Sequence, residues 1–114
     1  MVARNKLLEA PPYPVEQTLQ RLGANLRTAR LRRNLTLDEL AEKIGTGVRA
    51  IADAERGKPS TGVAVYMAML WAFDLLHYLD DVAAPEKDEE GLRLSRLQDR
   101  DRSRPARGGL SNDF

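Results

Sequence analysis

Residues 35–59 read LTLDELAEKIGTGVRAIADAERGKP, and this stretch decides the fold. Thr36 is followed three residues later by Glu39, which is the spacing of a capping box at the start of a helix. The apolar residues that follow recur at three- and four-residue steps as far as Ile44. The sequence therefore predicts a short helix that begins after Thr36 and ends at Ile44.

A second short helix is predicted directly after the first. Gly45-Thr46-Gly47 breaks the first helix, and the next one is expected to run through Glu55 and to end at Gly57. Ala41 before the turn and Ile51 after it are small or apolar, as a close crossing of the two helices requires. Two helices joined by three residues with glycine at the turn are the pattern of the helix-turn-helix, a DNA-binding motif.

The chain before this motif is predicted to form an arm and then a longer helix. Residues 1–15 contain three prolines and are expected to form an irregular, flexible arm. A helical period then begins near Gln17, and Asn34, which tolerates the left-handed conformation, is expected to end it. The residues expected on its inward face are Leu19, Leu22, Leu26, Ala29 and Arg30.

After the motif, two further helices are predicted. Pro59-Ser60-Thr61 supplies hydroxyls that can cap a helix, and the run from Val63 to Phe73 is apolar all round, so it is expected to be buried on most sides. Asp74 is expected to cap a short last helix over residues 75–80. No segment alternates as a strand. The sequence thus predicts an all-α domain of five helices over residues 16–83.

Residues 84–114 differ sharply in composition from the rest of the chain. They are charged and hold few apolar residues, which predicts a disordered polar tail with a nascent helix over residues 86–98. Charge also changes along the chain: residues 1–60 hold eleven Lys and Arg against seven Asp and Glu, residues 61–91 one against seven, and residues 92–114 six against three. This asymmetry suggests that different segments meet different partners.

Several function classes are excluded or disfavoured by composition. The chain has no cysteine and one histidine, His77, so no disulfide, zinc site or other metal centre is predicted. No nucleophile, base and orienting acid converge, so neither an enzyme nor a cofactor is expected. The longest apolar run is far shorter than the ~20 residues that span a bilayer, and no signal peptide is visible. We expect a cytoplasmic protein that associates with the nucleoid when bound to DNA.

The residues from Leu26 to Pro59 resemble the Cro/phage-repressor-like (XRE) family, whose spacing they match without insertion. The resemblance implies a lambda-repressor-like fold and a buried ion pair between Arg30 and Glu55; taken without it, Arg30 would be assigned to phosphate. It also implies that the outer face of the second motif helix reads DNA bases. The corresponding residues are Gly47, Val48, Arg49 and Asp53.

This predicted reading face departs from the family pattern. Position 47 is commonly serine or threonine in the family, whereas here it is glycine. Arg49 can pair with guanine and Val48 can contact a thymine methyl group. Asp53 can accept a hydrogen bond from cytosine but repels phosphate, and the alternative is that Asp53 is merely solvated.

Phosphate contacts are predicted at helix N-termini and in the segment after the motif, because free N–H groups there suit phosphate oxygens. The predicted residues are Thr36, Arg56, Lys58, Ser60 and Thr61. Arg27, Arg32 and Arg33 add positive field, although each is more readily explained as solvated. Double-stranded DNA is therefore the predicted partner.

A homodimer is also predicted, because proteins of this kind read two half-sites about one turn of DNA apart. The predicted interface residues are Leu75, Leu76, Tyr78 and Leu79; ordinary core packing is the alternative. Within the family, residues 57–61, the aromatic-rich helix after them and Pro85–Gly91 resemble HipB-type antitoxins. That resemblance implies a repressor that controls its own operon and pairs with a HipA-like kinase toxin. The alternative is a protein-interaction module with weak or no DNA reading of its own.

Overall fold

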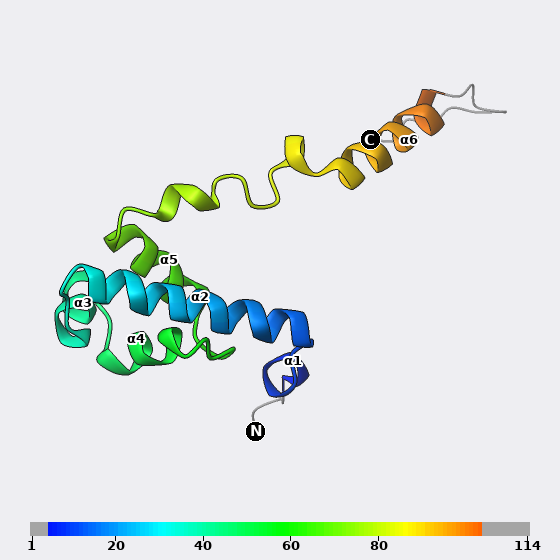
Figure 1. Ribbon diagram of the computed structural model, residues 1–114. Coiled ribbons are helices and arrows are strands. Elements are labelled where there is room, and N and C mark those ends of the chain that lie inside the picture. The colour runs from blue at the N-terminus through cyan, green and yellow to red at the C-terminus, as the bar shows by residue number, and fades with distance from the viewer. Residues whose placement is uncertain (1–4, 104–114) are drawn as a thin grey trace. The chain divides into compact units, whose positions relative to one another are not determined.

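The computed structural model describes residues 5–103, and every regular element within them is helical (Figure 1). The chain divides into two compact units, with the boundary between His77 and Tyr78. The α-helices are α1 (Lys6–Glu9), α2 (Tyr13–Arg32), α3 (Leu37–Ile44), α4 (Val48–Glu55), α5 (Val63–Ala72) and α6 (Glu89–Ser103). Two 3₁₀-helices, η1 (Leu76–Leu79) and η2 (Pro85–Lys87), lie between α5 and α6. The predicted all-α fold is confirmed.

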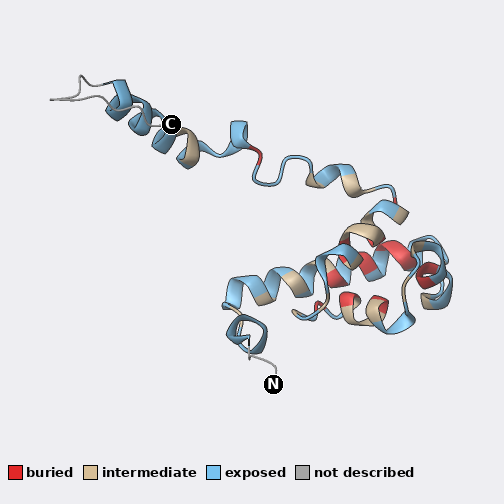
Figure 2. Cartoon of the chain, turned by 180° about the vertical axis from the view of Figure 1, so that it is seen from behind, coloured by how far each residue is buried: buried red, intermediate tan, exposed pale blue. Residues whose placement is uncertain are grey.

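The core of the first unit is built from α2, α3, α4 and α5. Figure 2 shows the buried residues concentrated in these helices. They are Leu26, Ala29, Leu40, Ala41, Ile51, Ala54, Tyr66, Met69 and Phe73. Leu40, Ile51 and Met69, one from each of three helices, have no exposed surface. Ala41 and Ile51, which the sequence predicts at the crossing of the two motif helices, both belong to this core.

Two glycines allow α2 to lie directly against the end of α4. A Cβ atom at Gly23 would lie 2.6 Å from the carbonyl oxygens of Ala54 and Glu55. Gly57 has a left-handed φ of 69°, and a Cβ there would lie 2.5 Å from the carbonyl oxygen of Leu19. Backbone thus meets backbone at this crossing, where no side chain fits.

The predicted irregular arm is wrong for the residues that the structure describes. Asn5 accepts hydrogen bonds from the backbone N–H groups of Leu7 and Leu8, at 3.0 and 3.4 Å, and so caps α1. Helix α2 begins at Tyr13 rather than near Gln17. Pro14 does not prevent this, because the first turn of a helix needs no hydrogen bond from its N–H groups. Residues 1–4 of the predicted arm lie outside the described residues.

Helix α5 begins and ends differently from the prediction. Gly62 is its N-cap and no side chain caps it, so Ser60 and Thr61 do not have the predicted capping role. Asp74 has a φ of 62°, and its N–H donates to the carbonyl of Trp71, so Asp74 ends α5 instead of beginning the next helix. The last predicted helix is the 3₁₀-helix η1.

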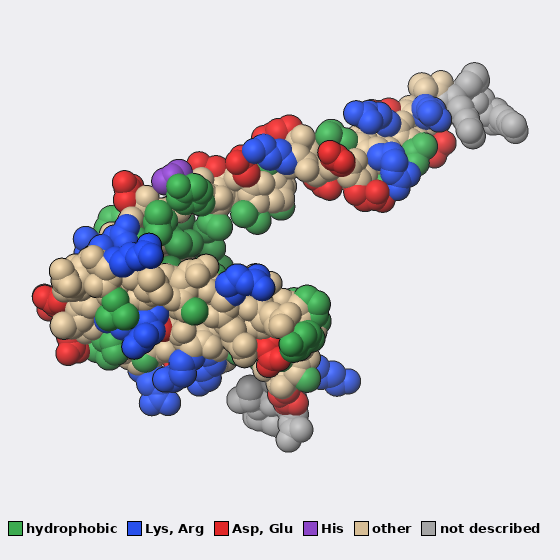
Figure 3. All heavy atoms as spheres, in the orientation of Figure 1, with side chains coloured by type: hydrophobic (Ala, Val, Ile, Leu, Met, Phe, Trp, Pro, Cys, Tyr) green, Lys and Arg blue, Asp and Glu red, His purple; other side chains and the backbone are tan. Residues whose placement is uncertain are grey.

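Burial of α5 on most sides is also a wrong prediction for the single chain. Tyr66 and Met69 are buried, but Val63 is 66% exposed and Trp71 is 58% exposed. The physical reason is that α3 and α4 are the helices packed against α5, on the side that carries Tyr66 and Met69. Its other side remains an apolar surface, and hydrophobic side chains gather over α5 in Figure 3.

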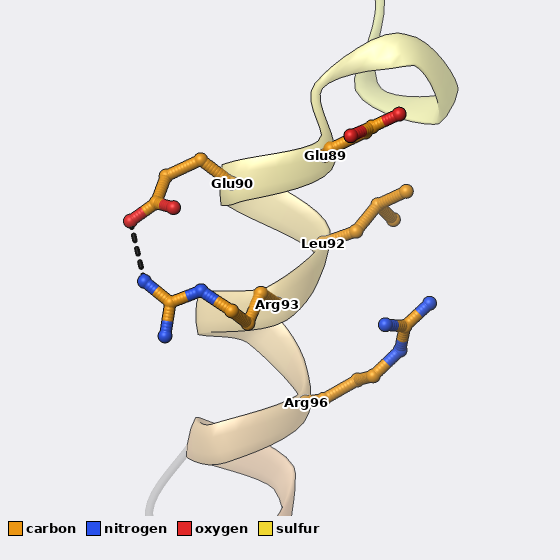
Figure 4. A pocket seen from close by; sticks show the side chains of 5 residues that line it. All are labelled: Glu89, Glu90, Leu92, Arg93 and Arg96. Atoms are coloured by element: carbon orange, nitrogen blue, oxygen red, sulfur yellow. Dashed lines mark hydrogen bonds and ion pairs between the residues drawn. The ribbon is translucent and has the colours of Figure 1, made fainter.

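The second unit is more ordered than the predicted tail. Asp88 accepts a hydrogen bond from the N–H of Gly91 at 3.0 Å at the start of α6, which runs to Ser103 and not to residue 98. Glu90 and Arg93 pair at 2.6 Å along its surface (Figure 4). Ion pairs three residues apart support an isolated helix, and no residue of α6 is buried. Residues 104–114 of the predicted tail lie outside the described residues.

Candidate nucleic-acid interface

The turn between α3 and α4 has the geometry that its sequence predicts. The hydroxyl of Thr36 accepts from the N–H of Glu39 at 3.0 Å, and the Glu39 carboxylate accepts from the N–H of Thr36 at 2.8 Å, so the capping box is complete. Gly45 ends α3 with a left-handed φ of 81°, and Gly47 is the N-cap of α4. Residues 37–55 therefore form two helices set by local signals at each end.

Arg30 and Glu55 form a bidentate ion pair that joins α2 to the end of α4. The distances are 2.6 Å from Nε to Oε2 and 3.0 Å from Nη2 to Oε1, and the two side chains are 8% and 7% exposed. Nη1 of Arg30 also donates to the carbonyl of Leu35 at 2.9 Å. Hydrogen bonding to Glu55 raises the pKa of Arg30 against the opposing effect of burial. Arg30 is thus held within the fold, which fits the structural role that the resemblance implies and not a phosphate contact.

The outward surface at the start of α4 has few side chains that can form hydrogen bonds with DNA. Gly47, Val48 and Arg49 are all exposed. A Cβ atom built at Gly47 meets no other atom within 4 Å, so the site has room for a side chain that this protein lacks. Arg49 is the one exposed side chain among the three that can donate hydrogen bonds to a base edge.

The structure places Asp53 differently from the other predicted base-reading residues. Its side chain is 15% exposed, and Oδ1 accepts from Nη2 of Arg56 at 2.5 Å. Oδ2 lies 3.8 Å from Nζ of Lys58. The carboxylate is therefore paired with two cations and not merely solvated, and its role as a base reader stays a prediction. Sequence reasoning missed this arrangement, although the three-residue spacing from Asp53 to Arg56 is a signal for it.

Arg56 and Lys58, two of the predicted phosphate contacts, have exposed side chains. Their side chains are 65% and 47% exposed, and Lys and Arg side chains gather beside α4 in Figure 3. Ser60 is also exposed. Thr36 is exposed as well, with its hydroxyl engaged in the capping box.

Thr61, another predicted phosphate contact, is half-buried. Its hydroxyl oxygen is buried, and its N–H donates to the carbonyl of Lys58 at 3.0 Å. The same carbonyl accepts from the Tyr66 hydroxyl at 3.3 Å, and burial raises the pKa of Tyr66. Thr61 therefore helps to fold the segment between α4 and α5, and a phosphate contact by this residue stays a prediction.

Arg33 has a structural role that the sequence reasoning missed, since solvation was the preferred explanation for it. Nη2 of Arg33 donates to the carbonyl of Phe73 at 3.1 Å, Nη1 donates to that of Ala29 at 2.9 Å, and the guanidinium lies 5.1 Å from the centre of the Phe73 ring. It thus binds the C-terminus of α5 to α2. Forty residues separate the partners, so no local pattern announces the contact.

The predicted dimer residues differ in exposure. Leu75 packs against the core of the first unit, as the core-packing alternative holds, and Leu76 is half-buried. In the second unit, Tyr78 is 71% exposed and Leu79 is half-buried.

Two other kinds of site are not found in the part of the chain that the structure describes. No three acidic or histidine side chains there are grouped so as to hold a metal ion. No helix among residues 5–103 is both long enough and apolar enough to cross a membrane.

Comparison with known proteins agrees with this geometry. Residues 26–74 match the family model described as helix-turn-helix. An uncharacterized HTH-type transcriptional regulator, y4mF, of Sinorhizobium fredii (strain NBRC 101917 / NGR234) is 41% identical over 49 residues. That match covers 43% of this chain and 64% of the relative, so the chain spans less than two thirds of the relative's length. No solved structure matches the chain significantly. The XRE-type helix-turn-helix is thus supported, and the HipB-type subgroup stays a prediction.

Proposed function

We propose that this protein is a non-enzymatic, DNA-binding transcriptional regulator that places α4 in the major groove. The observation that carries the proposal is the α3–turn–α4 unit, whose second helix is joined to α2 by the Arg30–Glu55 ion pair. Residues 26–74, which include this unit, match the helix-turn-helix family model. Arg49 faces outward from α4 to read a base, while Arg56 and Lys58 flank it and bind phosphates. The relative's printed description as a transcriptional regulator supports the same role.

The proposed active form is a homodimer. Helix α5 presents Val63 and Trp71 to solvent, and large exposed apolar side chains on one helix are typical of an interface. A single outward arginine on α4 gives little discrimination, whereas two copies read two half-sites. Leu76, Tyr78 and Leu79 remain proposed contributors, and Leu75 contributes less because it packs in the core.

We further propose the role of a cytoplasmic repressor and antitoxin that pairs with a HipA-like kinase toxin. This rests on the resemblance of residues 57–61 and 85–91 to HipB-type antitoxins. A specific observation favours a second candidate, a protein-interaction module with weak DNA reading: the start of α4 offers Gly47 and Val48 where polar side chains are usual. A kinase-like reading frame beside the gene supports the antitoxin role, and its absence contradicts it.

Duplex titration at several salt concentrations tests DNA binding. Each phosphate that the protein neutralises adds about −0.9 to the slope of log affinity against log salt. We expect salt-dependent binding of a fluorescent genomic duplex between 50 and 200 mM salt, abolished or flattened when Arg56 and Lys58 are both changed to glutamine. Lys6→Gln/Arg21→Gln, at two exposed positions that have no assigned DNA contact, is the matched control for the loss of two charges. Binding by no genomic duplex supports the interaction module instead.

A further inference from the structure

The carboxylate of Asp53 lies among the cations that the proposed function assigns to phosphate. It is 2.5 Å from the Arg56 guanidinium and 3.8 Å from the Lys58 ammonium, and it is the one acidic side chain in that group. The three side chains together carry a net charge of +1, where the two cations alone would carry +2. A phosphate that approaches this cluster therefore meets half of the charge that Arg56 and Lys58 would carry alone.

The fold keeps Asp53 in this position. The backbone carbonyl of Asp53 accepts from the N–H groups of Arg56 at 3.1 Å and of Lys58 at 3.0 Å, so the chain wraps around this residue as it leaves α4. The side chain is 15% exposed, whereas Arg56 and Lys58 remain largely exposed. A shielded carboxylate beneath two exposed cations lowers their field without standing in the way of a ligand.

We propose that Asp53 is an affinity-limiting residue that reduces sequence-independent attraction to DNA by offsetting the charge of Arg56 and Lys58. This inference rests on the proposed function. Phosphate contacts hold a protein on any sequence, whereas base contacts distinguish one sequence from another. Lowering the phosphate contribution weakens binding to all duplexes by the same factor. Asp53 therefore sets how tightly the protein holds DNA of any sequence, and the ratio of affinities for two sequences stays with base readers such as Arg49.

The size of the effect follows from counterion release. With Asp53 present, the cluster neutralises one phosphate per bound copy, and with Asp53 neutral it neutralises two. One additional neutralised phosphate makes the salt slope steeper by about 0.9. Relative to 1 M salt, where this term is zero, the same slope raises affinity for a duplex of any sequence about fivefold per bound copy at 150 mM salt and about 15-fold at 50 mM.

The test measures the affinity of Asp53→Asn and Asp53→Ala for a random-sequence duplex at four salt concentrations. Asparagine keeps the shape of the side chain, and alanine keeps the helix if asparagine disturbs it. Glu42→Gln, which makes the same charge change at an exposed position of α3, is the matched control. Thermal unfolding is recorded for each variant, and we expect small changes because partly exposed ion pairs contribute little.

We expect tighter binding and a steeper slope for both Asp53 variants, and unchanged behaviour for Glu42→Gln. Folded variants that bind the random duplex no more tightly than the wild type overturn the inference. A changed preference at one base pair with an unchanged slope also overturns it and makes Asp53 a base reader. A wild-type chain that binds no duplex even at 50 mM salt contradicts the proposed function itself, which separates the two failures.

Discussion

The inward and outward sides of α4 differ sharply in what they contribute. The inward side carries Ile51 and Ala54, which have no exposed surface, and Glu55, which is bonded twice to Arg30. The outward side begins with Gly47, Val48 and Arg49, which are all exposed. The inward side fixes the position of α4 in the fold. The outward side has few side chains that can read DNA bases. A helix-turn-helix fold and strong DNA reading are therefore separate properties.

Removing the Arg30–Glu55 ion pair on the inward side is expected to lower stability more than any other change proposed here. Glu55→Ala leaves the Arg30 guanidinium buried without its partner, which lowers the free energy of unfolding by about 3–5 kcal/mol. Chemical denaturation monitored by circular dichroism measures this. Glu42→Ala on the exposed surface of α3 is the control and should change stability by less than about 0.5 kcal/mol. Equal stability of the two variants contradicts the account of the ion pair.

Gly23→Ala tests the backbone crossing behind α4. Alanine favours a helix by about 1 kcal/mol over glycine, but here its Cβ atom meets two carbonyl oxygens at 2.6 Å. Overpacking of this kind gives a net loss of about 2 kcal/mol in unfolding free energy. Ala24→Gly, at the exposed neighbouring position, should lose only the propensity term of about 1 kcal/mol. A stabilised Gly23→Ala variant shows that α2 and α4 do not meet as closely as described.

Arg49→Ala tests the outward side alone. The variant should unfold at the same temperature as the wild type and lose about 1–3 kcal/mol of discrimination at one base pair. Competition between duplexes that differ at single positions measures this loss. Loss of stability without change in sequence preference indicates that Arg49 belongs to the fold and not to the reading surface.

Gly47→Ser adds a hydroxyl group at the N-cap of α4, where the wild-type protein has no side chain. As an N-cap residue, serine stabilises a helix by about 0.3 kcal/mol more than glycine does. The open space at Gly47 accepts the serine side chain. We expect a small rise in thermal stability together with tighter DNA binding. Gly47→Ala, which adds a Cβ atom without a hydroxyl, separates the two effects, because it should show neither gain.

Local sequence signals predicted the parts of the fold that depend on neighbouring residues. The capping box at Thr36 and Glu39, the glycine turn and the left-handed Asn34 each follow from side-chain chemistry within a few residues. The pairing of Arg30 with Glu55 came from the family resemblance, because charge alone does not say which arginine is buried.

The rest depends on contacts that a local pattern does not contain. Arg33 meets Phe73 forty residues away, and Gly23 is needed only because α4 ends against it. Thr61 looked like a surface hydroxyl, but the fold of the segment after α4 buries it. Burial of Asp53 between two cations likewise follows from how the chain leaves α4. Helix α6 was underestimated because its composition is polar, although its ends carry favourable caps and charges.

Selection of duplexes from fragments of the source genome tests the central claim most directly. The wild-type chain at 150 mM salt and the folded Arg49→Ala variant are taken through the same selection. The account predicts that the wild type enriches one motif with half-sites about one helical turn apart, and that Arg49→Ala retains binding but loses preference at one position in each half-site. A stable wild-type fold that enriches no motif would contradict the assignment of α4 as a DNA-reading helix.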